Sequence, residues 1–124
     1  MSYTEYMLWE ILFHKEFEKW FDAQEPGVQE AIASHLDVLE EEGPRLGRPY
    51  VDTLKDSNYP NLKELRVQHL GRPFRILFAF DPKRQAVLLV GGDKGGKKRW
   101  YEEHIPIAEQ RLQEHLAAIE KEEE

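Results

Sequence analysis

The sequence predicts an α+β domain in which one strand, two helices, three strands and a final helix follow one another (β-α-α-β-β-β-α). Two observations carry this prediction. Apolar residues recur at helical spacing over residues 17–39, and three short apolar segments separated by turn residues follow between residues 62 and 90. A chain of 124 residues has the length of one domain with one hydrophobic core, so we expect a single domain over residues 1–124.

The first half of the chain predicts a strand and a helical hairpin. Residues 6–13 are rich in aromatic and β-branched types. Because this segment is too short for a stable helix, it predicts a strand. Three aromatic residues at spacing i, i+3, i+4 begin at Phe17 and predict an amphipathic helix. Pro26 suits the first turn of a second amphipathic helix, which we expect to end at Gly43. Because both apolar stripes need a partner, the hairpin should cover a sheet.

The second half predicts a small antiparallel sheet and a C-terminal helix. Residues 44–61 are rich in Pro and Gly and predict a long ordered loop. Short connections make the next three strands an antiparallel meander, expected over residues 62–67, 74–80 and 85–90. Residues 91–98 should form a flexible basic loop, and a helical segment should restart at Pro106. We expect the acidic residues 118–124 to be disordered.

Composition excludes several classes of protein. The chain has no cysteine, which excludes a disulfide scaffold, thiolate catalysis and cysteine-ligated zinc, and which a reducing cytoplasm permits. No apolar run approaches the roughly 20 residues that span a bilayer. The N-terminus lacks the basic and apolar regions of a signal peptide. We therefore expect a cytoplasmic protein without a membrane partner.

Charge is distributed unevenly along the chain. The formal net charge is −7, yet residues 45–99 carry 13 basic and 5 acidic side chains between two acidic segments. A block with a balance of +8 inside an acidic protein predicts a basic face that meets a polyanion. The alternative is a scatter of basic side chains that the acidic helices balance after folding.

The glycine-rich segment at residues 91–98 has the spacing of a nucleotide phosphate loop. However, Lys98 stands where Ser or Thr must bind magnesium, and no parallel strand with a terminal acid follows. We therefore do not expect a nucleoside triphosphate site. A flexible turn with solubilising lysines is the plainer interpretation.

The five histidines are dispersed, and neither a His-Glu-x-x-His nor an Asp-x-Asp pattern is present. We therefore expect no metal and no cofactor. His69 and His104 flank the basic strands and are candidates for proton transfer. His35 lies beside the apolar stripe of the second helix and is expected to be structural.

Two arginines lie in otherwise apolar strands. Arg66 and Arg75 belong to adjacent antiparallel strands joined by a short turn, so they can approach each other on one face of the sheet. An arginine in such a strand needs a carboxylate partner or a solvent-open site that uses its charge. Glu64 is the candidate carboxylate for a structural pair with Arg75. The alternative is a phosphate clamp, because guanidinium forks match phosphate oxygens and stabilise charge developing on phosphorus.

The segment beyond the last strand can extend such a clamp. Lys94 and Arg99 supply further cations. Trp100 and Tyr101 supply rings of the kind that stack on the bases of single-stranded RNA. For Trp100 the alternative is a hydrophobic anchor of the C-terminal helix.

Several runs of the sequence resemble the HigB-like branch of the RelE/ParE toxin superfamily. They are residues 43–55, 61–66, 71–82 and 90–94, and the resemblance extends over about residues 7 to 118. It implies a RelE-like fold, a small sheet packed by a helical hairpin, and a toxin of a type II toxin–antitoxin operon. RelE and HigB members are metal-independent endoribonucleases that cut messenger RNA, typically in the ribosomal A site. A cognate helix-turn-helix antitoxin neutralises them.

The resemblance also implies roles for individual residues. Arg66 and Arg75 take the strand positions that bind and polarise the scissile phosphate. Lys94 matches the basic residue after the last strand, and Arg99 and Tyr101 fall where relatives keep a cation and an aromatic hydroxyl. The further RNA-binding residues expected around them are Arg72, Lys97, Lys98 and Trp100.

The implied reaction is attack of the ribose 2′-hydroxyl on the neighbouring phosphorus. The implied partners are messenger RNA and the ribosome, and no small-molecule cofactor is expected. The sequence leaves the general acid and base unassigned. Two alternatives stay open, because fold alone does not decide activity. ParE members inhibit DNA gyrase without cleaving RNA, and an inactive phage-derived protein would only bind its antitoxin.

Overall fold

The computed structural model describes residues 8–123 and has a five-stranded sheet at its centre. In spatial order the strands are β1-β5-β4-β3-β2. They comprise Glu10–Phe13 (β1), Val51–Thr53 (β2), Lys63–His69 (β3), Arg72–Phe80 (β4) and Gln85–Asp93 (β5). Three helices pack on this sheet: Lys15–Asp22 (α2), Pro26–Glu42 (α3) and Trp100–Glu123 (α4). This architecture confirms the predicted α+β class.

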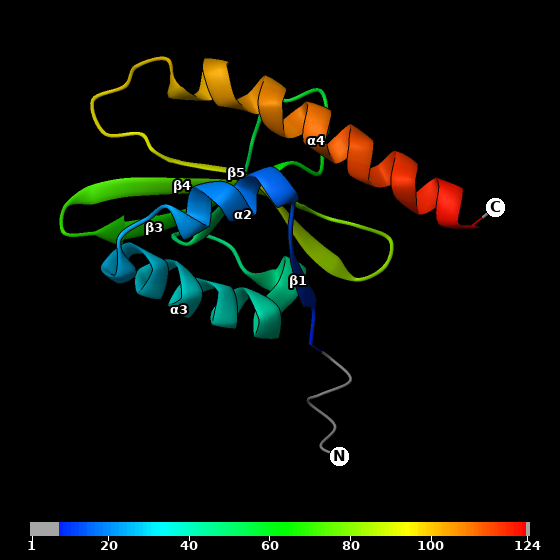
Figure 1. Ribbon diagram of the computed structural model, residues 1–124, viewed down its shortest axis with the longest axis horizontal. Coiled ribbons are helices and arrows are strands. Elements are labelled where there is room, and N and C mark those ends of the chain that lie inside the picture. The colour runs from blue at the N-terminus through cyan, green and yellow to red at the C-terminus, as the bar shows by residue number, and fades with distance from the viewer. Residues whose placement is uncertain (1–7, 124) are drawn as a thin grey trace.

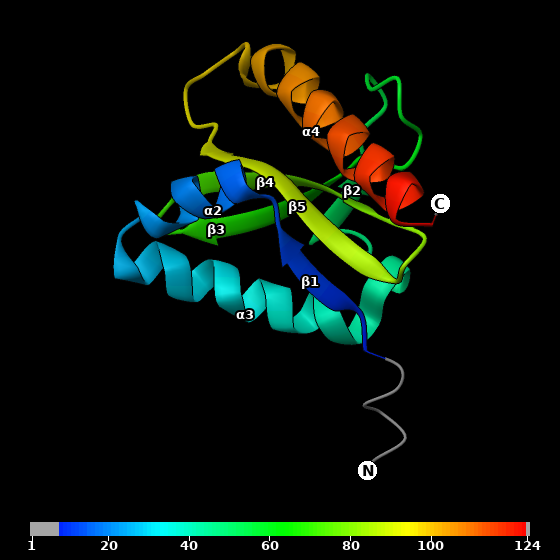
Figure 2. The ribbon, with the colours of Figure 1, turned by 45° about the vertical axis from the view of Figure 1, so that its right-hand side comes forward.

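The helices form two layers on opposite faces of the sheet. Helices α2 and α3 cover one face, and α4 lies across the other (Figures 1 and 2). The alternation of β4 explains this, because Phe74 and Ile76 join the core under the hairpin whereas Leu77 and Ala79 join the core under α4. The predicted helical hairpin and its contact with the sheet are therefore confirmed.

The strand pairing agrees with the predicted meander and adds a parallel strand. Strands β3, β4 and β5 are antiparallel neighbours, as expected. The N-terminal strand β1 pairs parallel with β5, from Glu10 opposite Gln85 to Phe13 opposite Leu88. It covers only residues 10–13, and residues 6 and 7 of the predicted strand lie outside the described part of the chain.

The predicted loop at residues 44–61 contains a short strand that the sequence prediction missed. A 3₁₀ turn over Gly43–Arg45 (η1) leads towards β2, which pairs antiparallel with the first half of β3. Three residues are too few to show the alternation by which a strand is recognised. This small strand makes one edge of the sheet and places the residues before it beside β3.

Helix α4 is longer and more continuous than predicted. It runs through Pro106 without a break, because Trp100 and Ile105 before the proline and Leu112 after it are all buried on the same face of the sheet. The prediction that residues 118–124 are disordered is wrong for residues 118–123, which are helical; residue 124 lies outside the described part. Within residues 8–123, no helix has the length and apolar character needed to cross a membrane.

The predicted flexible loop at residues 91–98 begins inside β5. Gly91 and Gly92 are buried strand residues, and a tryptophan ring lies against each of them. A Cβ atom on Gly91 would lie 2.6 Å from Trp20, and one on Gly92 would lie 2.7 Å from Trp100. These glycines are therefore required by packing, because a side chain at either position would overlap a ring.

We expect Gly91→Ala to lower the free energy of unfolding by about 1–3 kcal/mol, because the added methyl group overpacks the contact with Trp20. Urea denaturation of the purified variant measures the change. Gly47→Ala is the matched control, since nothing lies within 4 Å of its added methyl group. A Gly91→Ala variant that unfolds at the same urea concentration as the parent protein would contradict this packing role.

Candidate active site

The two predicted arginines lie directly opposite each other in the sheet. The register of β3 and β4 pairs Arg66 with Arg75, and Gly92 of β5 lies opposite Arg75 on its other side. By the alternation of β4, Arg75 shares the face of Leu77, which α4 covers. The first turn of α4 brings Tyr101 to this same place, since its hydroxyl reaches a carboxylate on β3.

That carboxylate belongs to Glu64 and joins the three side chains. Its Oε1 atom lies 2.8 Å from Nε of Arg66 and 3.5 Å from Nε of Arg75. It also accepts a hydrogen bond of 3.2 Å from the hydroxyl of Tyr101. Glu64 is only 3% exposed. The structure thus contains both the ion pair of Arg75 with Glu64 and the facing pair of arginines, which the sequence analysis treated as alternatives.

The two arginines differ in their surroundings. The side chain of Arg66 is 35% exposed and also lies 3.3 Å from a carboxylate oxygen of Asp52 in β2. The side chain of Arg75 is only 12% exposed and donates from Nη1 to the carbonyl oxygen of Phe74 at 3.0 Å. Its Nε atom is buried and makes no hydrogen bond. Arg75 therefore holds its charge in a site of low dielectric constant, where an anion would interact strongly with it.

The environment also affects the protonation of the site. The hydrogen bond to Glu64 raises the pKa of the Arg66 guanidinium. Burial raises the pKa of the Tyr101 phenol, and its hydrogen bond to Glu64 acts in the same direction. At neutral pH Tyr101 is therefore a proton donor beside two permanent cations.

The structure brings one more predicted cation to this cluster. Nζ of Lys94 lies 5.3 Å from the centre of the Tyr101 ring, within the range of a cation–π contact. Arg99 points elsewhere: its side chain is 79% exposed, and its Nε lies 3.3 Å from a carboxylate oxygen of Glu102. Lys97 and Lys98 are exposed on the connection between β5 and α4.

Arg72 is exposed at the start of β4 and engaged locally. Its Nε lies 3.0 Å from a carboxylate oxygen of Asp93, and its guanidinium lies 4.9 Å from the ring centre of Phe74. Arg72, like Arg99, therefore lies outside the cluster around Glu64.

The prediction that Trp100 stacks on RNA is wrong. Trp100 is 1% exposed, lies against Gly92, and stacks its ring on His104 with 4.1 Å between ring centres. It anchors the start of α4, which is the alternative that the sequence left open. Neither histidine proposed for proton transfer joins the arginines. Nδ1 of His104 lies 2.7 Å from the carbonyl oxygen of Trp100 in the same helix, and His69 lies against Gly27.

A pocket of about 350 Å³ opens beside the arginines at the edge of the sheet. Its lining residues come from α3, the segment before β2, and strands β3 and β4: His35, Pro49, Tyr50, Arg66, Gln68 and Arg75. The sequence analysis missed Tyr50 and Gln68. Alternation along β3 could have indicated Gln68, which lies two residues after Arg66, but no local pattern indicates Tyr50.

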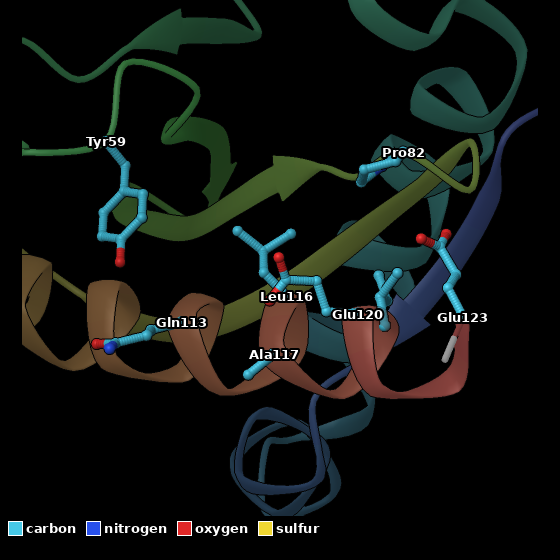
Figure 3. A pocket seen from close by; sticks show the side chains of 8 residues that line it. Tyr59, Pro82, Gln113, Leu116, Ala117, Glu120 and Glu123 are labelled. Atoms are coloured by element: carbon cyan, nitrogen blue, oxygen red, sulfur yellow. The ribbon is translucent and has the colours of Figure 1, made fainter.

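A larger cavity of about 470 Å³ lies elsewhere, between the C-terminal half of α4, Tyr59 and the turn at Pro82 (Figure 3). Its lining is apolar apart from Gln113, Glu120 and Glu123 and contains no cation. Such a surface does not suit a phosphate. Within residues 8–123, no group of three or more His, Asp or Glu side chains could hold a metal ion.

Comparison with known proteins identifies the class to which this fold and site belong. Residues 19–113 match the family model described as Phage derived protein Gp49-like (DUF891). A Mycobacterium tuberculosis protein that bears the toxin name HigB3 is 50% identical over 109 residues, which cover 87% of this chain and 94% of that protein. A second protein of the same organism, bearing the toxin name HigB2, is 47% identical over 82% of this chain, although the match spans only 51% of its length.

Solved structures show the same fold at low sequence identity. A mutant of Escherichia coli toxin RelE in the free state aligns with a TM-score of 0.59 and 14% identity, over 77% of this chain and 94% of RelE. The archaeal RelE–RelB complex from Pyrococcus horikoshii aligns with a TM-score of 0.53 and 22% identity, over 73% of this chain and 99% of that one. The fold is thus that of the RelE toxins. The chain belongs to the Gp49-like family and is HigB-like.

Proposed function

We propose that this protein is the toxin of a type II toxin–antitoxin system and that it cleaves messenger RNA. The observation that carries the proposal is the pair of opposed arginines, Arg66 and Arg75, joined to the phenol of Tyr101 through Glu64 in a HigB-like chain. Two cations and a proton donor can stabilise the charge that develops on a phosphate and protonate the leaving oxygen.

The proposed reaction uses groups of the RNA, of this site and of solvent water. The ribose 2′-hydroxyl gives its proton to water, and its oxygen attacks the neighbouring phosphorus. The bond from phosphorus to the 5′-oxygen breaks, and the products are a 2′,3′-cyclic phosphate and a 5′-hydroxyl. Arg75 and Arg66 neutralise the charge that develops on the phosphate oxygens. In this proposal Lys94 contacts the RNA backbone. Tyr101, whose phenol pKa is raised by burial, donates the proton that the leaving 5′-oxygen takes up and regains one from water. Exposed Arg72, Lys97, Lys98 and Arg99 would bind RNA further from the cut.

We further propose the ribosome and a helix-turn-helix antitoxin as partners. The net charge of −7 and the acidic helices disfavour tight binding to free RNA, so the ribosome would supply much of the positioning. The solved RelE–RelB complex of P. horikoshii, whose RelE chain has this fold, supports a protein partner. An antitoxin with acidic residues would complement the cations around Lys94 and Arg99.

We expect expression of this chain alone to stop growth by cutting translated messages, because the arginine pair should act on RNA in the ribosome. Primer extension on a translated message measures this, and the expected result is 5′ ends inside the reading frame. Arg45→Ala is the control, since the side chain of Arg45 is 78% exposed and its ion pair with Glu42 lies at the surface. Intact messages together with DNA damage would instead indicate gyrase inhibition, and normal growth would indicate a protein that only binds its antitoxin.

A further inference from the structure

We propose that the pocket beside the arginine pair binds the nucleobase next to the scissile phosphate, with Tyr50 as its stacking surface and Gln68 as the group that reads its edge. This inference rests on the proposed function and deepens it, because it assigns a base subsite to an RNA-cleaving centre. The pocket volume of about 350 Å³ lies within the range of about 300–1,000 Å³ that is typical of small-ligand sites.

Tyr50 has the two properties that a stacking surface needs. Its side chain is 48% exposed, so one side of the ring is open to a ligand. It is also held in place, because its carbonyl oxygen accepts a hydrogen bond of 2.7 Å from the backbone N–H of Arg66, and its ring meets that of His35 edge-on at 5.9 Å. A fixed aromatic ring adjoining a phosphate-binding cation is a common arrangement for single-stranded RNA.

Polar groups on the pocket wall can distinguish one base from another. Gln68 is exposed on the face that Arg66 occupies, and its amide offers both a donor and an acceptor to a base edge. Nδ1 of His35 lies 2.8 Å from the carbonyl oxygen of Ala31. Because a carbonyl can only accept, Nδ1 donates this hydrogen bond, which leaves Nε2 as the second polar atom of the ring. The two side chains thus give the subsite directional hydrogen-bonding groups in addition to stacking.

The first experiment tests binding without requiring cleavage. The four ribonucleoside 3′-monophosphates are titrated into the whole protein, and NMR signals of Tyr50, Gln68 and His35 are followed. We expect these signals to shift, more with one base than with the others, and we expect Tyr50→Ala to weaken binding. Unchanged signals with all four nucleotides would overturn the inference.

The second experiment measures cleavage of a message in a reconstituted translation system. Base stacking on an aromatic ring is strong enough that Tyr50→Ala should lower kcat/KM by about 5- to 100-fold. Tyr50→Phe keeps the ring and should lower it less. Gln68→Ala should broaden the base composition next to the cut sites. Leu70→Ala is the control, because Leu70 is 87% exposed at the tip of the β3–β4 hairpin and outside the pocket. Thermal denaturation checks that each variant is folded.

The outcomes separate this inference from the proposed function. Nucleotide-induced shifts in a protein that cuts no message would uphold the base pocket and contradict the endoribonuclease proposal. Parent rates and an unchanged cut-site composition in both Tyr50→Ala and Gln68→Ala would contradict the pocket alone. If Tyr50→Ala cuts normally but no longer binds the antitoxin, the pocket is a protein interface and the inference is wrong.

Discussion

Replacing Arg75 with alanine is expected to slow messenger RNA cleavage by roughly 10²–10³-fold. Arg75 is the more buried member of the arginine pair, with only 12% of its side chain exposed, and it lies directly opposite Arg66 on the neighbouring strand. Charge that develops on a phosphate there is stabilised by a cation fixed in advance, so most of the loss should appear in the rate of the chemical step. Single-turnover cleavage on programmed ribosomes measures that rate.

Two further variants show whether the geometry or only the charge of Arg75 matters. Arg75→Lys keeps the charge but loses the planar fork, so we expect partial activity. Arg45→Ala removes an arginine whose side chain is 78% exposed and should leave cleavage unchanged. The loss of Arg75 still leaves Glu64 bonded to Arg66 and Tyr101, so the alanine variant should fold. A folded Arg75→Ala protein that cuts at the parent rate would remove Arg75 from the active site.

Local patterns in the sequence were sufficient to predict the central strands of the fold and the arginine pair of the site. Period-2 alternation in β4 separates Phe74 from Arg75, and the short hairpin turn forces β3 and β4 to be neighbours. Those two facts bring Arg66 and Arg75 to one face without any knowledge of the rest of the chain. The helical spacing from Phe17 onwards likewise predicted the layer that covers the opposite face.

The remaining features depend on contacts between residues that are distant in sequence. Tyr50 reaches the arginines only because β2 pairs with β3, and a three-residue strand leaves no pattern to recognise. The glycine-rich run looks flexible, but Trp20 and Trp100 pack against Gly91 and Gly92 from the two helical layers and extend β5. A proline usually marks a helix boundary, yet burial of α4 on both sides of Pro106 outweighs one missing hydrogen bond.

Glu64 also bears on the proposed phosphate contact, because its carboxylate lies against both Arg66 and Arg75. We expect Glu64→Gln to lower the free energy of unfolding by about 3–5 kcal/mol, since it leaves the buried guanidinium of Arg75 without a counter-charge. Glutamine has nearly the same shape, so the loss would come from charge and not from a cavity. Urea denaturation in a chloride buffer measures it.

Asp93→Asn is the matched control for that loss. It breaks the ion pair of Asp93 with Arg72, whose side chains are 29% and 45% exposed, and a surface pair contributes only about 0–1 kcal/mol. Equal stability of Glu64→Gln and the parent protein would show that the carboxylate does not balance the arginines.

The same variant should bind an oxyanion more tightly than the parent protein does. With the Glu64 carboxylate removed, Arg75 loses its counter-charge, and Arg66 keeps its contact with Asp52, so the pair can bind sulfate. Any ligand that binds only the folded state stabilises it. Sulfate also stabilises proteins in general. The Tm shift on replacing chloride with sulfate at constant ionic strength is therefore measured for both proteins, and the shift of the variant is compared with that of the parent. We expect a larger shift for Glu64→Gln than for the parent or Asp93→Asn. Equal shifts in all three would mean that the two arginines do not form an anion site, and the proposed phosphate contact would lose its basis.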